Sequence, residues 1–165
     1  GCAQFWGIPG CISPTTRAGR VAILSFDFVV CEETRRMSIE KKLFRDGPYA
    51  DLFCQGVRVG DTLYMAGQVG TDAAGVAPED LVAQMKNAYT HVSAVLSEYG
   101  ATIDNIVDET WFVTDIDDTM AKVGDLFMAR AEIYGKKPEV SQTLVQVAGL
   151  VDAAYKIEIK CIACL

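Results

Sequence analysis

Residues 57–66 read VRVGDTLYMA, and the Gly60-Asp61 pair divides this stretch into two short extended segments. A Gly-Asp pair between segments of apolar, β-branched and aromatic residues is typical of a β-hairpin with a two-residue turn. We therefore expect two antiparallel strands here, with a leading strand before them near residues 41–45.

Two helices are expected after the hairpin. Apolar side chains recur at spacings of three and four from Val82 to Tyr99, which predicts one amphipathic helix. Either Asp117 or Asp118 is expected to N-cap the second helix, and Gly135 is expected to end it. The apolar stripe of this second helix contains Met120, Val123, Phe127 and Tyr134.

Three further strands complete the pattern. They fall at residues 106–114, 140–147 and 155–163, and in the first of them Val107, Trp111 and Val113 are expected on one face. Because strands and helices interleave in the order β-β-α-β-α-β-β, the sequence predicts an α+β fold, a mixed sheet with two helices packed on one face.

The charge balance limits the partners. The chain of 165 residues carries 22 Asp and Glu against 15 Lys and Arg, for a formal net charge of −7. Nucleic-acid and anionic-membrane binders gain much of their affinity by neutralising phosphates, so neither partner is expected. No apolar run is long enough for a membrane span, and the nearest one, residues 21–30, is interrupted by Asp27. We expect a cytoplasmic protein.

Neither a metal nor a cofactor is expected. The six cysteines are expected to be reduced thiols, and the chain has one histidine and no Gly-rich phosphate loop. Cys161 and Cys164 form a CxxC motif at the end of the last strand, where residues three apart point to opposite faces. That geometry is poor for chelating a metal.

The first part of the chain differs from the rest. Residues 1–36 show no regular pattern apart from the apolar run 21–30. From Met37 onward, turn-forming residues separate the expected strands and helices at regular intervals. We expect residues 37–165 to form one complete domain, with Met37 as a natural start and residues 1–36 as an appended or non-native extension. The alternative is that residues 21–30 form an extra strand docked on the domain.

Four segments in order carry a family resemblance. They are Gly47-Pro48-Tyr49, residues 59–68 (VGDTLYMAGQ), residues 105–115 (NIVDETWFVTD) and residues 156–159 (KIEI). Over about residues 40–164 the chain resembles the Rid family of reactive-intermediate or imine deaminases, also called YjgF-like or L-PSP endoribonucleases. The resemblance implies a chorismate-mutase-like fold, a homotrimer with small-molecule clefts between subunits, and hydrolysis of imines or enamines to a carbonyl compound and ammonia.

The resemblance also implies site residues. The family's catalytic tyrosine and glutamate correspond to Tyr49 and Glu158. Glu158 is expected to orient a water for attack on a C=N carbon. The insertion of residues 50–54 after Tyr49 is expected either to move Tyr49 or to reshape the rim of the cleft.

The residues implied to bind substrate depart from the family pattern. Ala66 stands where a serine usually precedes Gly67, Asp117 replaces an asparagine, and Gln142 replaces the signature arginine that clamps the substrate carboxylate. A glutamine offers a neutral donor where a guanidinium makes two charge-assisted bonds, so only a weak hold on 2-imino acids is expected.

Two sets of alternatives stay open. Glu158 could instead belong to a surface ladder with Lys156 and Lys160, two residues away on either side. The protein could be a deaminase for a substrate without a carboxylate, or a non-catalytic trimeric ligand-binding module. Endoribonuclease or translation-inhibitor activity follows from the family label alone, and the acidic composition argues against it.

Overall fold

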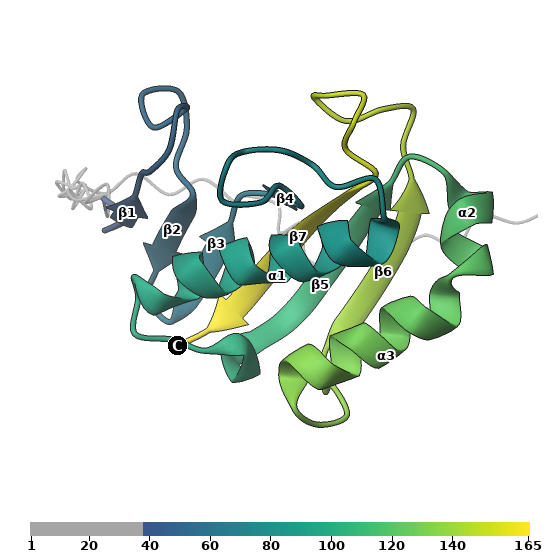
Figure 1. Cartoon of the computed structure of the whole chain (residues 1–165). Coiled ribbons are helices and arrows are strands. Elements are labelled where there is room, and N and C mark those ends of the chain that lie inside the picture. Colours follow the sequence, from purple (N-terminus) through teal and green to yellow (C-terminus); the bar gives the residue numbers. More distant parts are fainter. Residues whose placement is uncertain (1–37) are drawn as a thin grey trace, which may run out of the picture. The chain divides into compact units, whose positions relative to one another are not determined.

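The computed structural model describes residues 38–165, which form a sheet with helices against it (Figure 1). The elements in chain order are β1 (Lys42–Phe44), β2 (Gly56–Val59), β3 (Thr62–Met65), β4 (Gln68–Val69), α1 (Leu81–Ser97), the 3-10 turn η1 (Ile103–Asn105), β5 (Ile106–Val113), α2 (Ile116–Ala121), α3 (Val123–Tyr134), β6 (Ser141–Gln146) and β7 (Ile157–Cys164).

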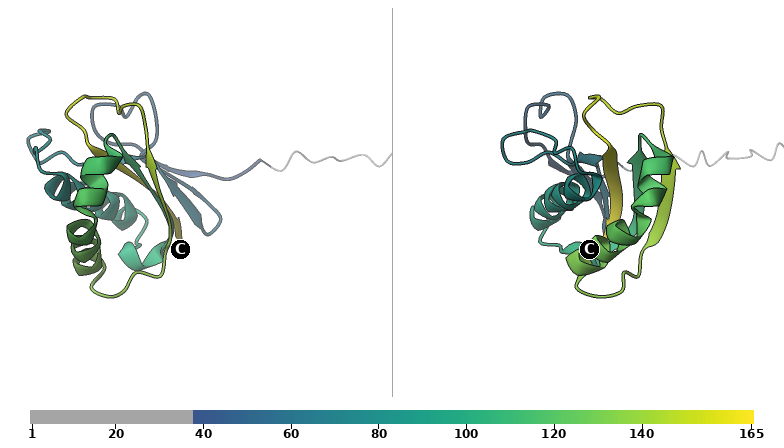
Figure 2. Two further views of the ribbon diagram at one scale, coloured as in Figure 1. Left: turned by 90° about the vertical axis from the view of Figure 1, so that its right-hand side faces the viewer. Right: turned by 45° about the vertical axis from the view of Figure 1, so that its right-hand side comes forward.

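The sheet is mixed, as the sequence predicts. Its strands lie in the order β1-β2-β3-β7-β5-β6, and the short β4 also pairs with β7. β5 and β6 are parallel, whereas the other pairs are antiparallel. The two views in Figure 2 show the helices of the described residues on one side of the sheet. The α+β architecture with helices on one face is therefore confirmed.

The hairpin that begins the fold is confirmed. β2 and β3 pair antiparallel, and Val59 lies opposite Thr62 across the Gly60-Asp61 turn. Gly60 has a φ of 58°, a left-handed conformation that glycine adopts at little cost.

The core lies between the sheet and the helices. Alternate residues of the two longest strands, β5 and β7, point into it because side chains on a strand alternate between faces. The fully buried side chains include Trp111, Val113, Ile157 and Ile159 from the sheet and Met85, Tyr89, Val92, Leu96 and Leu126 from the helices.

One predicted face residue is wrong. Val107 does not share the buried face of Trp111 and Val113 but is 48% exposed, and Ile106 is buried in its place. The register between β5 and β7 shifts between Ile106 and Asp108, which is a β-bulge. An extra residue at a bulge reverses the alternation on one side of it.

The second predicted helix is two helices. α2 begins at Ile116 and is N-capped by Asp115, whose side chain accepts a hydrogen bond from the Asp118 N–H, so neither Asp117 nor Asp118 is the cap. The helix is interrupted at Lys122, and α3 begins at the next residue, Val123. The predicted apolar stripe is therefore only partly right: Tyr134 is buried, but Met120 and Phe127 are 53% and 41% exposed.

The structure also bears on the cysteines, on metal-binding clusters and on membrane spans within residues 38–165. Cys54, Cys161 and Cys164 are free thiols; Cys161 is buried and Cys164 exposed, as expected for opposite faces of a strand. Between residues 38 and 165, no cluster of three or more His, Cys, Asp or Glu side chains has a metal-binding arrangement. In the same range, no helix combines the length and apolar character needed to cross a bilayer. Residues 1–36, with the apolar run 21–30, lie outside the described residues.

The position of the core leads to a prediction about the extension. Among the described residues, the hydrophobic core and its partly buried margin run from Phe44 to Leu165 and form a continuous packed unit. A chain that starts at Met37 should therefore fold with a melting temperature within about 5 °C of that of the full chain. Thermal unfolding of both chains measures this. A larger fall would mean that residues 21–30 contribute a strand to the domain.

Candidate functional site

The face of the sheet opposite the helices, called the open face below, carries Glu158. The register places Glu158 beside Phe112 of β5, and the next row joins Lys160, Thr110 and Thr143 across β7, β5 and β6. Side chains in register on neighbouring strands share a face, and the buried residues between them point to the helices. The open face therefore presents a carboxylate, a lysine, threonine hydroxyls and aromatic surface.

Glu158 has the properties of an acid–base group. Its side chain is half-buried, and this burial raises the pKa of Glu158 above the ordinary glutamate value, while the charge of Lys160 opposes the shift. A carboxyl group with a raised pKa exchanges a proton more readily near neutral pH than an exposed one does. Within residues 38–165 the Glu158 carboxylate has no hydrogen-bonding side chain or backbone group, so its oxygens can bind water or substrate.

Gly67 lies directly against Glu158. A Cβ atom built on Gly67 would collide with the Glu158 carboxylate and its Cγ atom, so a larger residue at this position would displace the Glu158 side chain. Val69, two residues on, pairs with Glu158 in the register of β4 and β7. The structure thus brings together the catalytic candidate Glu158 and the binding candidate Gly67. Ala66, next to Gly67, is half-buried, and its N–H donates to the Gln55 carbonyl.

The structure does not bring Gln142 and Glu158 together. Gln142 pairs with Glu109 and therefore lies on the helix-covered face, where its Nε2 atom is buried without a hydrogen-bond partner in the described residues. The neighbouring Thr143 pairs with Thr110 and lies on the open face. Within one subunit, the β6 side chains that share the open face with Glu158 are therefore those of Thr143 and Val145, and Gln142 is not among them.

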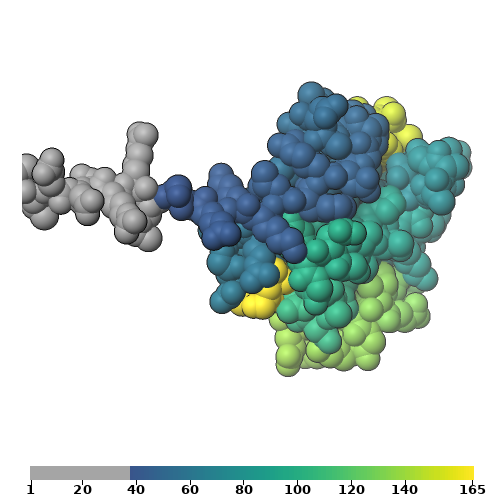
Figure 3. Space-filling view, turned by 90° about the vertical axis from the view of Figure 1, so that its left-hand side faces the viewer, coloured from purple at the N-terminus to yellow at the C-terminus, as the bar shows by residue number. Residues whose placement is uncertain are grey.

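Tyr49 lies in an ordered loop between β1 and β2. The Leu52 and Phe53 N–H groups donate to the Tyr49 carbonyl, at 2.9 and 3.2 Å, and Arg45 Nη1 donates to the Ala50 carbonyl at 2.8 Å. The rings of Tyr49 and Phe53 stack with centroids 5.9 Å apart. Figure 3, viewed from the β1 side, shows this part of the chain as a blue lobe on the surface. The insertion after Tyr49 thus presents apolar surface to solvent.

Asp117 and Lys156 lie away from Glu158. Asp117 is exposed in the first turn of α2. Lys156 precedes β7, and its Nζ atom donates to the Glu79 carbonyl at 2.6 Å, on the side of α1. The ladder of Lys156, Glu158 and Lys160 on one face is therefore wrong for Lys156, because its side chain turns toward the helices.

A buried polar cluster lies beneath the sheet, and the sequence analysis missed it. Glu109 is fully buried and its Oε1 atom lies 2.6 Å from Arg130 Nε of α3. Glu109 Oε2 accepts from the hydroxyls of Tyr89 and Tyr134, at 2.8 and 3.1 Å. The Tyr89 hydroxyl in turn accepts from Trp111 Nε1 at 3.2 Å.

The ionisation of this cluster follows from its burial. Desolvation raises the pKa of Glu109, although Arg130 and the two tyrosine hydroxyls oppose the shift. Burial and the nearby Glu109 raise the pKa values of Tyr89 and Tyr134 well above the ordinary value, so both hydroxyls stay protonated and donate. The alternation of Glu109, Trp111 and Val113 is the sequence signal that places this carboxylate on the buried face.

Comparison with known proteins identifies relatives over most of the described chain. The family model described as "Endoribonuclease L-PSP" matches residues 47–165. "RutC family protein YjgH" of Escherichia coli is 33% identical over 67% of this chain and 81% of its own length. A protein of Capra hircus named "2-iminobutanoate/2-iminopropanoate deaminase" is 32% identical over 71% of this chain and 80% of its own length.

Solved structures agree with these sequence matches. The structure of protein YJGH superimposes with a TM-score of 0.66 and 31% identity, covering 77% of this chain and 98% of that one. The structure titled "Crystal structure of E. coli TdcF with bound serine" superimposes with a TM-score of 0.62 and 25% identity, covering 77% of this chain and 97% of that one.

Proposed function

Because this chain belongs to the endoribonuclease L-PSP family, the Rid or YjgF-like family that its sequence resembles, we propose that it hydrolyses imines or enamines to a carbonyl compound and ammonia. The observation that carries this proposal is the half-buried Glu158 on the open face, with free carboxylate oxygens and a raised pKa. Relatives named as 2-iminobutanoate/2-iminopropanoate deaminases support the same reaction class.

Glu158 acts first as a base and then as an acid in this proposal. The ionised carboxylate takes a proton from a water whose oxygen attacks the carbon of a protonated C=N bond, and the C=N π pair moves to nitrogen. This step gives a neutral carbinolamine. Glu158 then returns the proton to the amine nitrogen. As the C–N bond breaks and ammonia leaves, the hydroxyl oxygen forms the C=O double bond and its proton passes to the Glu158 carboxylate, which releases it to ammonia or water. Gly67 leaves the space that the carboxylate occupies.

The test is release of ammonia from 2-iminobutanoate generated in the assay by an amino acid oxidase. Wild-type protein should accelerate loss of the imine above its spontaneous hydrolysis. Because β6 contains no Lys or Arg that could bind this substrate's carboxylate, poor saturation is expected. If neither this imine nor an enamine without a carboxylate is hydrolysed faster than in buffer, the deaminase proposal fails.

The position of a carboxylate anchor can be tested directly. Thr143→Arg places a guanidinium on the open face in the row of Lys160, and it should raise kcat/KM for 2-iminobutanoate about ten-fold, mainly through KM. Gln142→Arg is the matched control. It adds a second cation on the buried side, where Arg130 already faces Glu109, so it should lower the melting temperature without a gain in activity. A gain in Gln142→Arg alone would contradict the assignment of faces.

The uncovered sheet supports a proposed homotrimer with the substrate clefts between subunits. Tyr64, Val107 and Val145 are between 39% and 49% exposed, and exposed apolar side chains grouped on a sheet face are typical of a protein–protein interface. Light scattering should give about 54 kDa, three times the 17.9 kDa of one chain. A monomer in solution would contradict both the trimer and a shared cleft.

A second candidate function is a non-catalytic trimeric module that binds a small metabolite. The observation that favours it is the open face of β6, which carries Ser141, Thr143 and Val145 and so offers no charged anchor. Saturable binding of an imine analogue without ammonia release would select this function. Cleavage of single-stranded RNA, the activity in the family label, would contradict both, and the net charge of −7 disfavours it.

A further inference from the structure

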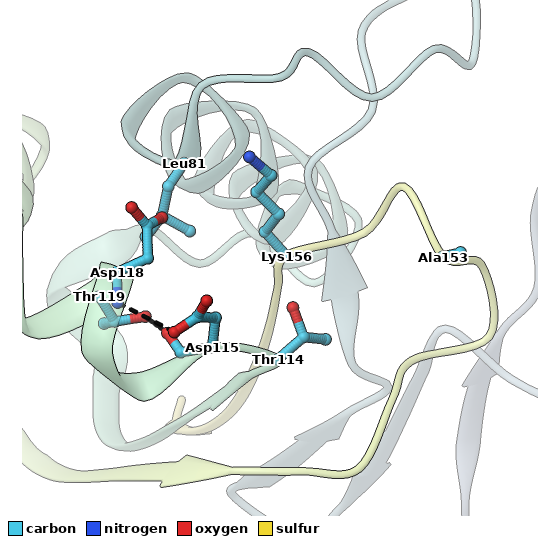
Figure 4. Close-up of a pocket in the computed structure, with 7 residues that line it drawn as sticks. All are labelled: Leu81, Thr114, Asp115, Asp118, Thr119, Ala153 and Lys156. Carbon is cyan, nitrogen blue, oxygen red and sulfur yellow. Dashed lines mark hydrogen bonds between the residues drawn. The ribbon is translucent and has the colours of Figure 1, made fainter.

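A cavity of about 340 Å³ lies where the start of α1, the start of α2 and the loop before β7 meet (Figure 4). Three segments far apart in the sequence enclose it: the start of α1 at Leu81, the β5–α2 junction at Thr114 and Asp115, and the loop before β7 that ends at Lys156. The Thr114 N–H donates to the Lys156 carbonyl at 3.1 Å and so ties two of these segments together. The site was not apparent in the sequence, because only the fold brings the segments together.

Charges of opposite sign face this cavity without pairing with each other. Lys156 Nζ is held by the Glu79 carbonyl at 2.6 Å, and Asp115 Oδ1 is held by the Asp118 N–H at 3.0 Å. No ion pair in the described part of the chain includes Lys156 or Asp115. Each charge is thus fixed by a backbone group and keeps capacity for another partner.

The other acid at the cavity is already neutralised. Both oxygens of Asp118 accept from Lys122 Nζ, at 2.7 and 2.9 Å. Among the residues that line the cavity, the charged groups without an ion-pair partner are therefore one carboxylate, on Asp115, and one ammonium, on Lys156. A ligand with a single charge would satisfy one of them and face an unpartnered like charge at the other.

We propose that this cavity binds a short amino-acid zwitterion. The ligand's ammonium would donate to Asp115 and its carboxylate would accept from Lys156, with the Thr114 hydroxyl beside the Lys156 backbone as a further polar contact and Leu81 against the methylene groups. Two charge-assisted hydrogen bonds of opposite polarity fix both the orientation and the class of the ligand. The volume exceeds that of such a molecule and leaves room for bridging water.

This site is distinct from the proposed active site. Glu158 lies on the open face, whereas Lys156 reaches toward α1. Binding at the cavity is therefore expected to be independent of Glu158, and it can be measured whether or not the protein is a deaminase.

Ligand-observed NMR titration of the full-length chain tests the proposal, with β-alanine and 4-aminobutanoate as zwitterionic probes. Butylamine and butanoate are the matched probes with one charge each. Asp115→Asn and Lys156→Met each remove one charge, and asparagine caps a helix as well as aspartate does, so α2 should remain folded. Asp125→Asn and Lys137→Met remove exposed charges that do not line the cavity.

A saturable signal is expected for at least one zwitterion, weakened about ten-fold or more in Asp115→Asn and in Lys156→Met. The two control variants and Glu158→Gln should bind as the wild type does. Four results would overturn the proposal: no zwitterion binding, equal binding of a singly charged probe, unchanged binding in both cavity variants, or loss of binding in Glu158→Gln.

Discussion

Replacing Glu158 with glutamine should reduce imine hydrolysis by about two to four orders of magnitude, the range typical for removal of a general acid–base group. Glutamine keeps nearly the same shape beside Gly67 but cannot take a proton from water. The loss should appear in kcat rather than in KM, because the substrate's other contacts remain. The measurement is ammonia release at saturating and at limiting imine concentrations.

Two comparisons separate a catalytic role from a structural one. Glu98→Gln removes an exposed carboxylate at the end of α1 and should leave kcat unchanged. Gly67→Ala keeps Glu158 but displaces its carboxylate, so it should lower kcat as well. A Glu158→Gln variant with wild-type kcat would mean that another group activates the water.

The pH dependence follows from the direction of the pKa shift. Burial raises the pKa of Glu158, so the acidic limb of the kcat/KM profile should lie at higher pH than an ordinary glutamate gives, and it should be missing in Glu158→Gln. The same shift sets the sign for stability. A carboxyl group whose folded pKa is raised loses its contribution as the pH rises through that pKa. Glu158→Gln should therefore gain melting temperature relative to wild type as the pH increases.

Replacing Glu109 with glutamine should lower the free energy of unfolding by about 3–5 kcal/mol, because it leaves the buried Arg130 guanidinium without a counter-charge. For a domain of this size, such a loss lowers the melting temperature by more than about 6 °C. Asp104→Asn is the matched control. The Asp104–Lys136 pair has a similar N···O distance, 2.7 Å, but both side chains are more than half exposed. Solvent screens such a pair, so almost no change in melting temperature is expected.

A double variant tests the reason for the loss. Glu109→Leu with Arg130→Met removes both charges and fills the space with apolar atoms, so it should recover at least half of the stability lost in Glu109→Gln. The recovery stays incomplete because the Tyr89 and Tyr134 hydroxyls lose their acceptor. A double variant as unstable as the single one would mean that the tyrosine hydrogen bonds, and not the ion pair, hold this cluster together.

Local patterns in the sequence predicted most of the secondary structure. The hairpin depends on residues next to each other at Gly60-Asp61, and α1 depends on a spacing within one segment, so neither needs information from elsewhere in the chain. The N-cap of α2 was misplaced by two or three residues, since three aspartates near its start can each cap a helix and only the backbone selects Asp115.

The face on which a strand residue lies depended on tertiary structure. The motif match alone assigns Gln142 to the substrate cleft, and it does not say on which face of the sheet the side chain lies, because a register shift of one residue moves a side chain to the other face. Pairing of β6 with β5 places Gln142 beside the buried Glu109 and leaves Thr143 on the open face. The bulge at Val107 reverses faces in the same way, and no local pattern marks it.

The sequence by itself determined the family, the α+β class and the candidate Glu158, because each depends on residue types at fixed spacings along the chain. Only the tertiary structure decided which side chains meet. It joins Glu109 of β5 to Arg130 of α3 and the two tyrosines, and it brings Lys156 and Asp115 to one cavity. The physical reason is that these contacts join residues from separate elements, whose approach is fixed by packing of the shared core and not by any local propensity.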